Sequence, residues 1–206
     1  MLGSEQQPTR SALLALQEEQ SVVQEAYDFL DEKRLLLAAE LLAQLKRYES
    51  LRQQQDSLQQ QATRALGSAI SCHGLQGLSV YPAPAIDQWQ LDKQQHNFMG
   101  VYLMTTRLAI QQQEDTVRNQ PCYPTPEAQQ CRELWLELIK LNAILAGVST
   151  SIHRLLAEYR KTERRARALE NIILPELDHL LIEMTSHLEE MEQEDAVRTH
   201  LEYGNF

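Results

Sequence analysis

The feature that most constrains this chain is a seven-residue hydrophobic repeat in its first third. No glycine or proline interrupts the stretch from Arg10 to Leu66. Two interleaved series of positions seven apart form an apolar seam typical of a left-handed coiled coil. The stronger series is Leu16, Val23, Leu30, Leu37, Gln44, Leu51, Leu58 and Ala65, and the weaker is Leu13, Gln20, Tyr27, Arg34, Leu41, Tyr48, Gln55 and Ala62. Residues 1–66 are therefore predicted to hold a long helix that begins at Pro8 and Thr9 and stops at Gly67.

The last part of the chain, residues 125–206, repeats this pattern. Thr125 is a favourable N-cap and Pro126 suits the first helical position. Its two apolar series are Leu134, Leu141, Val148, Leu155, Thr162, Leu169 and Leu138, Leu145, Ile152, Tyr159, Ala166, Ile173, Leu180. Two seams of similar length predict that the helices bury each other. We expect antiparallel packing, with both chain termini at one end.

Between the helices, residues 67–124 form a short insert of different character. The segments "LSVYPAPAI" and "NFMGVYLMTT" are rich in Val, Tyr and Phe and are predicted to be extended, whereas "DQWQLDKQQ" is too polar to assign. The predicted fold class is all-α: a long antiparallel two-helix coiled coil with a small mixed or β-hairpin tip insert. We expect this tip at the end away from the termini.

Composition excludes several functional classes. The chain has no glycine-rich phosphate loop, and its His, Cys and carboxylate residues show no ligand spacing. We therefore predict no catalytic residues, no cofactor and no metal site. The three cysteines, Cys72, Cys122 and Cys131, are expected to be reduced thiols.

Charge and hydropathy point to a cytoplasmic protein without its own membrane segment. The formal net charge is -10 and the pI is about 5.1, which argues against nucleic-acid binding. No run of about 18 apolar residues supports direct membrane insertion, and no signal peptide is recognisable.

One basic run stands out against this acidic background. It comprises Arg160, Lys161, Arg164, Arg165 and Arg167. At about 100° per residue, these side chains point away from the seam marked by Tyr159, Thr162 and Ala166. The run is either a solvated helical face or a binding surface for acidic groups of a partner.

Pro175 lies inside an otherwise helical pattern, on the same outward side as the basic run. It removes one backbone hydrogen bond and crowds the carbonyl of Asn171, so a local kink is expected. The seam steps by eight here, from Leu169 to Leu177, and continues through Met184 and Met191. Alternatively, Pro175 separates two helices.

The order of these features resembles the D subunit of the V-type (vacuolar or archaeal-type) rotary ATPases, the shaft of their central stalk. Four blocks carry the resemblance across nearly the whole chain: "PTRSALLAL", "LDEKRLLL", "NFMGVYL" and "KTERRARALENIILPEL". The chain departs from the family pattern at Leu35 and Arg167, where the family usually has Asp and Asn. It also has an acidic "EEMEQED" near its C-terminus, where the family is usually basic.

The resemblance implies a non-catalytic rotor subunit that transmits torque between ATP hydrolysis or synthesis and proton or sodium translocation. Its implied partners are the hexamer of catalytic and regulatory subunits, a small companion F subunit of the stalk, and a socket subunit of the membrane ring. The termini would insert into the hexamer, and the tip would lie toward the membrane, on the cytoplasmic face. The outward basic run, Arg160, Arg164, Arg165 and Arg167, would then meet acidic loops of the hexamer.

Other functions share parts of this pattern. A coiled-coil scaffold or a stator stalk would have the heptads without the insert motif or the block of basic residues and proline. An F-type rotor shaft pairs its terminal helices in the same way but carries a larger domain between them. An enzyme with a coiled-coil arm would need a catalytic constellation, and a nucleic-acid reader would use the Arg-rich helix.

Overall fold

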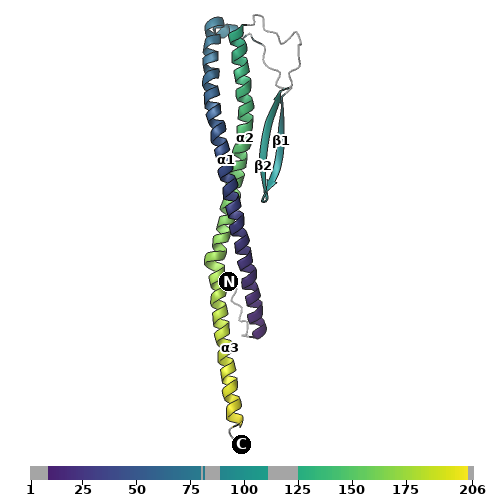
Figure 1. Cartoon of the computed structure of the whole chain (residues 1–206), viewed down its shortest axis with the longest axis vertical. Coiled ribbons are helices and arrows are strands. Elements are labelled where there is room, and N and C mark those ends of the chain that lie inside the picture. The colour runs from purple at the N-terminus through teal and green to yellow at the C-terminus, as the bar shows by residue number, and fades with distance from the viewer. Residues whose placement is uncertain (1–8, 80, 82–88, 111–124, 204–206) are drawn as a thin grey trace. The chain divides into compact units, whose positions relative to one another are not determined.

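A computed structural model of the chain describes residues 9–79, 81, 89–110 and 125–203. Its elements follow the order α1 (Arg10–Ser79), β1 (Trp89–Phe98), β2 (Val101–Ile110), α2 (Pro126–Ala168), the π turn η3 (Leu169–Ile173) and α3 (Leu174–Tyr203) (Figure 1). A long N-terminal helix and a long C-terminal helix thus flank a small antiparallel β-hairpin, and the predicted fold class is confirmed.

The chain divides into two compact units. Unit 1 consists of Met1–Leu36 and Tyr159–Phe206, and unit 2 consists of Leu37–Glu158. Each unit therefore pairs a segment of α1 with a segment of the C-terminal helical region, and unit 2 also holds the hairpin.

The start of α1 matches the prediction, whereas its end does not. The Thr9 hydroxyl accepts a hydrogen bond from the Ala12 N–H at 3.3 Å and caps the helix. The expected stop at Gly67 is wrong, because the helix continues to Ser79. Its regular geometry breaks instead at Gly74, whose φ of 69° and ψ of 164° suit a residue without a Cβ. A Cβ added at Gly67 would meet no atom within 4 Å, so this position does not require glycine.

Both predicted apolar series of α1 face the seam. Every member from Leu13 to Ala65 is buried or half-buried, and Leu37 and Ala62 are fully enclosed. Polar members such as Gln20 and Gln55 are half-buried as well, and each makes a contact across the seam. The seven-residue period therefore predicted the inward face of the helix correctly along both units.

In unit 2 the two helices run antiparallel. The Gln55 Nε2 donates to the Asn142 Oδ1 at 2.8 Å, and the His73 Nε2 lies 2.5 Å from the Thr125 Oγ1. Chain position rises along one helix as it falls along the other. The apolar core comprises Leu37, Ala62, Ala69, Val101, Ala128, Cys131, Leu138, Val148 and Leu155.

The hairpin pairs β1 and β2 in a register that runs from Trp89 opposite Ile110 to Phe98 opposite Val101. Its two-residue loop, Met99 and Gly100, has positive φ values of 50° and 86°, as expected for the tight turns that match strand twist. The stretch that was too polar to assign contains most of β1. Of "LSVYPAPAI", Leu78 and Ser79 are helical, and of the rest only Tyr81 lies among the described residues.

The hairpin docks on α2 through the outer edge of β2 (Figure 1). The Ser151 hydroxyl accepts a hydrogen bond from the Met104 N–H at 2.7 Å, and Arg154 Nη1 donates to the Tyr102 carbonyl at 2.9 Å. The Thr106 hydroxyl donates to the carbonyl of Ala143. Gly147 makes this approach possible, because a Cβ there would lie 3.0 Å from the Thr106 nitrogen and 3.2 Å from the Met104 oxygen.

In unit 1 the two helices are also antiparallel, but their seam is more open. Arg10 Nη2 lies 2.5 Å from Glu192 Oε1, and Gln20 Nε2 donates to Asp178 Oδ1 at 2.5 Å. Between Arg10 and Leu36 every seam residue is only half-buried. On the opposite helix, Thr162, Ala166 and Leu177 are enclosed.

The C-terminal seam differs from the prediction at three residues, Ile173, Leu180 and Met191. Ile173 and Leu180 are 37% and 43% exposed, so they do not continue the series through Ala166. The physical reason is the π turn at Leu169–Ile173, which adds one residue and rotates the following side chains. The predicted step to Leu177 is confirmed, since this side chain is 6% exposed, and Met184 is half-buried. The predicted continuation to Met191 is wrong, because this side chain is 50% exposed.

The helical stretch Pro126–His200 contains one window that is long and apolar enough to cross a membrane by length and composition alone. A helix that packs on two partners meets the same criterion. Segment α2 has such partners in α1 and in the hairpin, through Asn142 and Ser151 respectively. Its apolar character therefore has an explanation within unit 2.

Candidate partner-binding surface

The basic run lies in unit 1, near the end of α2, and all five of its side chains are exposed. Two of them are partly engaged along their own helix. Arg167 forms an ion pair with Glu163 at 2.7 Å, and Arg164 Nε donates to the Arg160 carbonyl at 3.3 Å. An exposed pair four residues apart contributes little stability, so these cations are able to exchange partners.

Pro175, the predicted kink residue, is exposed on α3 directly after the π turn. The Leu174 N–H bonds to the Leu169 carbonyl, five residues back instead of four. In a regular α-helix the proline ring would crowd the carbonyl of Asn171, and the wider turn relieves that contact. The helical path thus continues past Pro175 through a local irregularity.

Large apolar side chains are exposed beside the seam of unit 1, a feature that the sequence analysis missed. Val22, Phe29 and Leu36 lie seven positions apart on α1 and are 64%, 61% and 41% exposed. Ile172 and Leu180 on the opposite helix are 54% and 43% exposed. We call these five residues the apolar flank.

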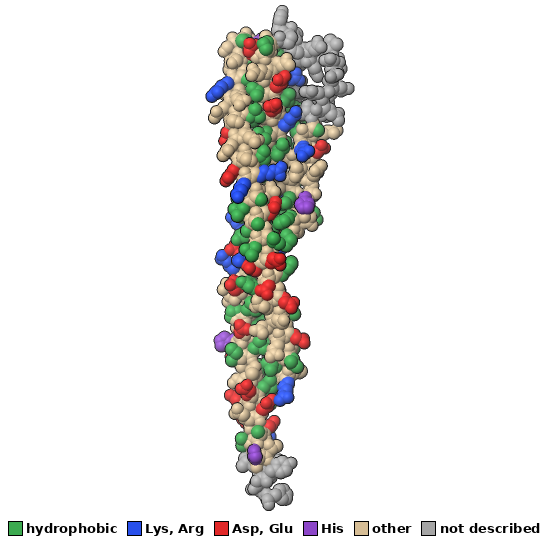
Figure 2. Space-filling view, in the orientation of Figure 1, with side chains coloured by type: hydrophobic (Ala, Val, Ile, Leu, Met, Phe, Trp, Pro, Cys, Tyr) green, Lys and Arg blue, Asp and Glu red, His purple; other side chains and the backbone are tan. Residues whose placement is uncertain are grey.

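The apolar flank lies on one side of the seam and the polar contacts lie on the other. Ile172 and Leu180 each lie two positions after Glu170 and Asp178, and in a heptad such columns stand on opposite sides of the seam. Asp178 accepts a hydrogen bond from Gln20, and the charge of Glu170 raises the pKa of the Tyr27 phenol. Figure 2 shows hydrophobic side chains at the surface along much of the visible face, interspersed with charges.

A second seven-residue series parallel to the seam was the signal that could have revealed the flank. Val22, Phe29 and Leu36 repeat with the same period as Val23, Leu30 and Leu37, one position earlier. Ile172 and Leu180 could not be found in this way, because the π turn changes their spacing.

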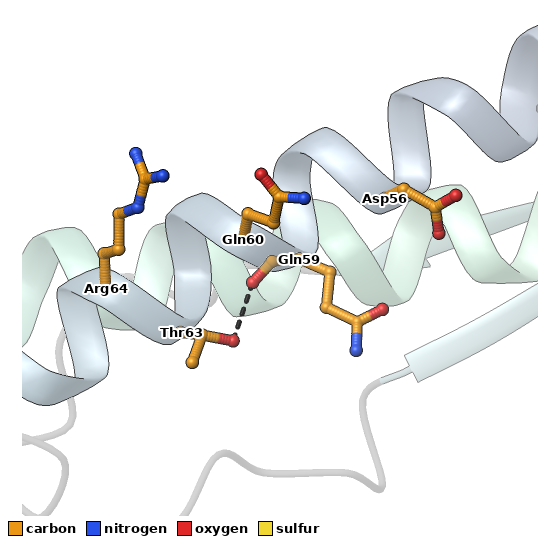
Figure 3. Close-up of a pocket in the computed structure, with 5 residues that line it drawn as sticks. All are labelled: Asp56, Gln59, Gln60, Thr63 and Arg64. Carbon is orange, nitrogen blue, oxygen red and sulfur yellow. Dashed lines mark hydrogen bonds between the residues drawn. The ribbon is translucent and has the colours of Figure 1, made fainter.

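The described residues offer little for catalysis. No group of three or more His, Cys, Asp or Glu among them could hold a metal ion. A shallow depression in unit 2 is lined by Asp56, Gln59, Gln60, Thr63 and Arg64 (Figure 3). These side chains all come from α1, and the Thr63 hydroxyl donates to the Gln59 carbonyl at 2.8 Å. One helical face without an opposing wall does not enclose a substrate.

Three groups have pKa values raised by their surroundings, and none lies in a cleft. The hydrogen bond to Glu192 and its negative charge raise the pKa of the exposed Arg10 guanidinium. Partial burial raises the pKa of the Tyr27 phenol, and the negative charge of Glu170 adds to the effect. Burial raises the pKa of the Cys131 thiol, which disfavours a reactive thiolate. Cys72 and Cys131 are free thiols, as predicted, and Cys122 lies outside the described residues.

Comparison with known proteins identifies the family. The family model for the D subunit of ATP synthase matches residues 12–201. The chain belongs to the ATP synthase D-subunit family. The D subunit of the V-type ATP synthase of Thermotoga neapolitana is 27% identical over 192 residues, covering 93% of both chains. The D subunit of the A-type ATP synthase of Methanococcoides burtonii is 27% identical over 199 residues, covering 96% of this chain and 97% of the relative.

A third relative, the D subunit of the A-type ATP synthase of Pyrococcus horikoshii, is 27% identical over 192 residues and covers 93% of this chain and 90% of its own. The matched range of the D-subunit family model includes the seam of α1, the hairpin, the basic run and Pro175. The predicted resemblance to the V/A-type D-subunit family is therefore confirmed.

Proposed function

We propose that this chain is the non-catalytic rotor shaft of a V/A-type ATPase and carries torque between the catalytic hexamer and the membrane ring. The observation that carries the proposal is membership of the D-subunit family combined with a helix pair that, among the described residues of unit 1, encloses only Thr162, Ala166 and Leu177. A shaft needs axial stiffness and surfaces for other subunits. Two long helices with exposed apolar and basic side chains meet both needs.

The partners are those implied by the family: the hexamer of catalytic and regulatory subunits, the companion F subunit of the stalk, and the socket subunit. We assign the hexamer to the outward basic run, because Arg can form bidentate hydrogen bonds with acidic loops. We assign the companion subunit to the apolar flank, because exposed apolar surface beside a two-helix seam suits a third apolar helix. The complex would be peripheral, on the cytoplasmic face of the membrane.

The basic run is tested by the double substitution Arg164→Ala and Arg165→Ala in the assembled complex. We expect ATP hydrolysis coupled to ion movement to fall severalfold, with the helical content of the chain unchanged. The matched control is Arg52→Ala with Arg64→Ala, two exposed cations of α1 in unit 2. Equal coupled activity in the two double variants would remove the basic run from the proposal.

The apolar flank is tested by Val22→Ser with Phe29→Ser, read out as the amount of companion subunit that co-purifies with the chain. We expect at least about a tenfold loss, because two large side chains of the docking surface are removed. The control is Leu14→Ser with Leu35→Ser, because Leu14 and Leu35 are 61% and 62% exposed and lie off the flank column. Undiminished companion binding by the flank variant would exclude this docking surface.

Purification of the native complex separates the shaft from its main alternative. Co-purification with a hexameric ATPase and one small subunit is expected. Recovery of the chain alone, or as a homodimer, would favour a coiled-coil scaffold.

A further inference from the structure

In unit 1, the same length of seam contains one residue more on the C-terminal helix than on α1. On α1, Tyr27 and Gln20 lie seven positions apart. On the opposite helix, Asp178 accepts a hydrogen bond from Gln20, and Glu170, whose charge raises the pKa of the Tyr27 phenol, lies eight positions before it. The opposite helix therefore contains one residue more than the heptad pattern of α1 requires.

The spacing of buried residues shows the same one-residue excess independently. Thr162 and Leu177 are 2% and 6% exposed and lie fifteen positions apart, one more than two heptads. In an uninterrupted α-helix, one extra residue would rotate Leu177 away from the seam by about 100°. The π turn at Leu169–Ile173 takes up this residue through the bond from the Leu174 N–H to the Leu169 carbonyl.

Two seam registers exist for the segment after the π turn. In the observed register the columns toward α1 are Leu174, Leu181, Leu188 and Leu177, Met184, all buried or half-buried, whereas Met191 is 50% exposed. Without the π turn, strict seven-residue steps from Ala166 and Leu169 would bring in Ile173, Leu180, His187 and Glu176, Glu183, Glu190. In this second register, the carboxylates of the three glutamates would be buried in the seam, where an unpaired charge is costly.

We infer that the π turn η3 is a register lock for α3, held by the apolar seam beyond it and not by Pro175. The lock selects the leucine and methionine columns and keeps the three glutamates in water, where the structure places them. It also leaves Ile172 and Leu180 exposed, so it determines which side chains of this helix join the apolar flank. The register lock acts within unit 1 whether or not the chain carries torque.

Deletion of single residues tests the lock in the full-length chain. Deletion of Ile172 removes the extra residue where the π turn holds it, so the helix becomes continuous and the seam keeps its register. Deletion of His179 removes an exposed residue from regular helix and rotates everything after Asp178 by about 100°. The two variants have the same length and lose a residue at different places, and the Ile172 deletion also removes one exposed side chain of the apolar flank.

Spin labels at Arg10→Cys and Glu192→Cys report the register through their distance distribution, and circular dichroism reports the melting temperature. The background carries Cys72→Ser, Cys122→Ser and Cys131→Ala. Both deletions carry Pro175→Ala, because a proline inside a continuous helix would itself be destabilising. For the Ile172 deletion we then expect the parental distance and a melting temperature within a few degrees of that of Pro175→Ala alone. For the His179 deletion we expect a shifted or broadened distance and a clearly lower melting temperature. Equal damage from the two deletions would overturn the register lock.

Pro175→Ala separates the seam from the proline as the cause of the π turn. The label distance between positions 10 and 192 is expected to stay parental, because the apolar columns still require the extra residue. A changed distance in Pro175→Ala would show that the proline holds the turn, and would overturn the inference.

Discussion

Unit 2 encloses its apolar side chains, whereas unit 1 leaves many of its own open. Among the described residues, nine apolar side chains are buried in unit 2, and two, Ala166 and Leu177, are buried in unit 1. Most of the large apolar side chains that remain exposed belong to unit 1. The same heptad seam of α1 runs through both units.

The difference follows from the number of packing layers. In unit 2 the hairpin covers α2 on a side that α1 does not reach, so Val101, Thr106 and Ser151 become enclosed. Within the described residues, unit 1 has two helices and no third layer. Two helices alone bury only a narrow stripe, and a partner that binds the folded state would supply the missing layer and stabilise it.

The largest expected effect compares one leucine from each unit. Leu155→Ala empties a fully buried site in unit 2 and should lower the free energy of unfolding by about 2–5 kcal/mol. Leu30→Ala in unit 1 removes a half-buried side chain and should cost less than about 2 kcal/mol. Urea denaturation of the full-length chain measures both. Equal losses would mean that the two seams are packed alike.

The docking of the hairpin on α2 gives the second comparison. Gly147→Leu places a side chain against the backbone of Met104 and Thr106 and should cost about 1–3 kcal/mol. Hydrogen exchange should rise in residues 89–110 and stay unchanged in α1. Gly67→Ala is the control, since no atom lies within 4 Å of its added Cβ and a helical Gly-to-Ala change stabilises by about 0.5–1 kcal/mol. A Gly147 variant with a fully protected hairpin would contradict this docking geometry.

Ser151→Ala should have a smaller effect at the same contact. It removes the acceptor for the Met104 N–H, for an expected cost of about 1 kcal/mol. Thr150→Ala is a suitable control, because the Thr150 hydroxyl bonds within its own helix, to the Ala146 carbonyl. If thermal unfolding shows the same stability for both variants, the Ser151 bond does not hold the hairpin.

The smallest expected effect is the pH dependence that Tyr27 contributes to unit 1. The pKa of its phenol is raised in the folded chain, so the neutral form is favoured there. This contribution is fully present below the pKa of the unfolded chain, about 10, and is lost as pH rises through the folded pKa. Tyr27→Phe should therefore flatten the decline in melting temperature at alkaline pH. An equally steep decline in the variant would assign it to other groups.

Periodicity predicted the parts of the fold that depend on one repeating interaction. The seam of α1 follows from Leu16, Val23, Leu30 and Leu37, and the start of α2 follows from Thr125 and Pro126. The outward position of Arg164 and Arg165 could be predicted from the same helical count.

Features that depend on a single local contact were beyond that reach. In strand β1 only the end residues Trp89 and Phe98 are partly buried, and the residues between them are exposed on both faces. The strand therefore does not need alternating apolar and polar residues, and the sequence lacks the pattern by which a strand is predicted. The eight-residue step was visible at Leu177, whereas Ile173 and Leu180 were placed wrongly because a π turn leaves no residue signature of its own. Gly67 and Gly74 are both candidate helix ends by residue type, and only the backbone angles show that the regular helix breaks at Gly74.

Hydrogen exchange of the full-length chain, alone and within the assembled ATPase, tests most directly the claim that partner subunits complete unit 1. We predict low protection of residues 10–36 and 159–203 in the isolated chain and a large gain on assembly, with residues 37–79 and 126–158 protected in both states. Unchanged exchange in residues 10–36 and 159–203 on assembly would contradict the account.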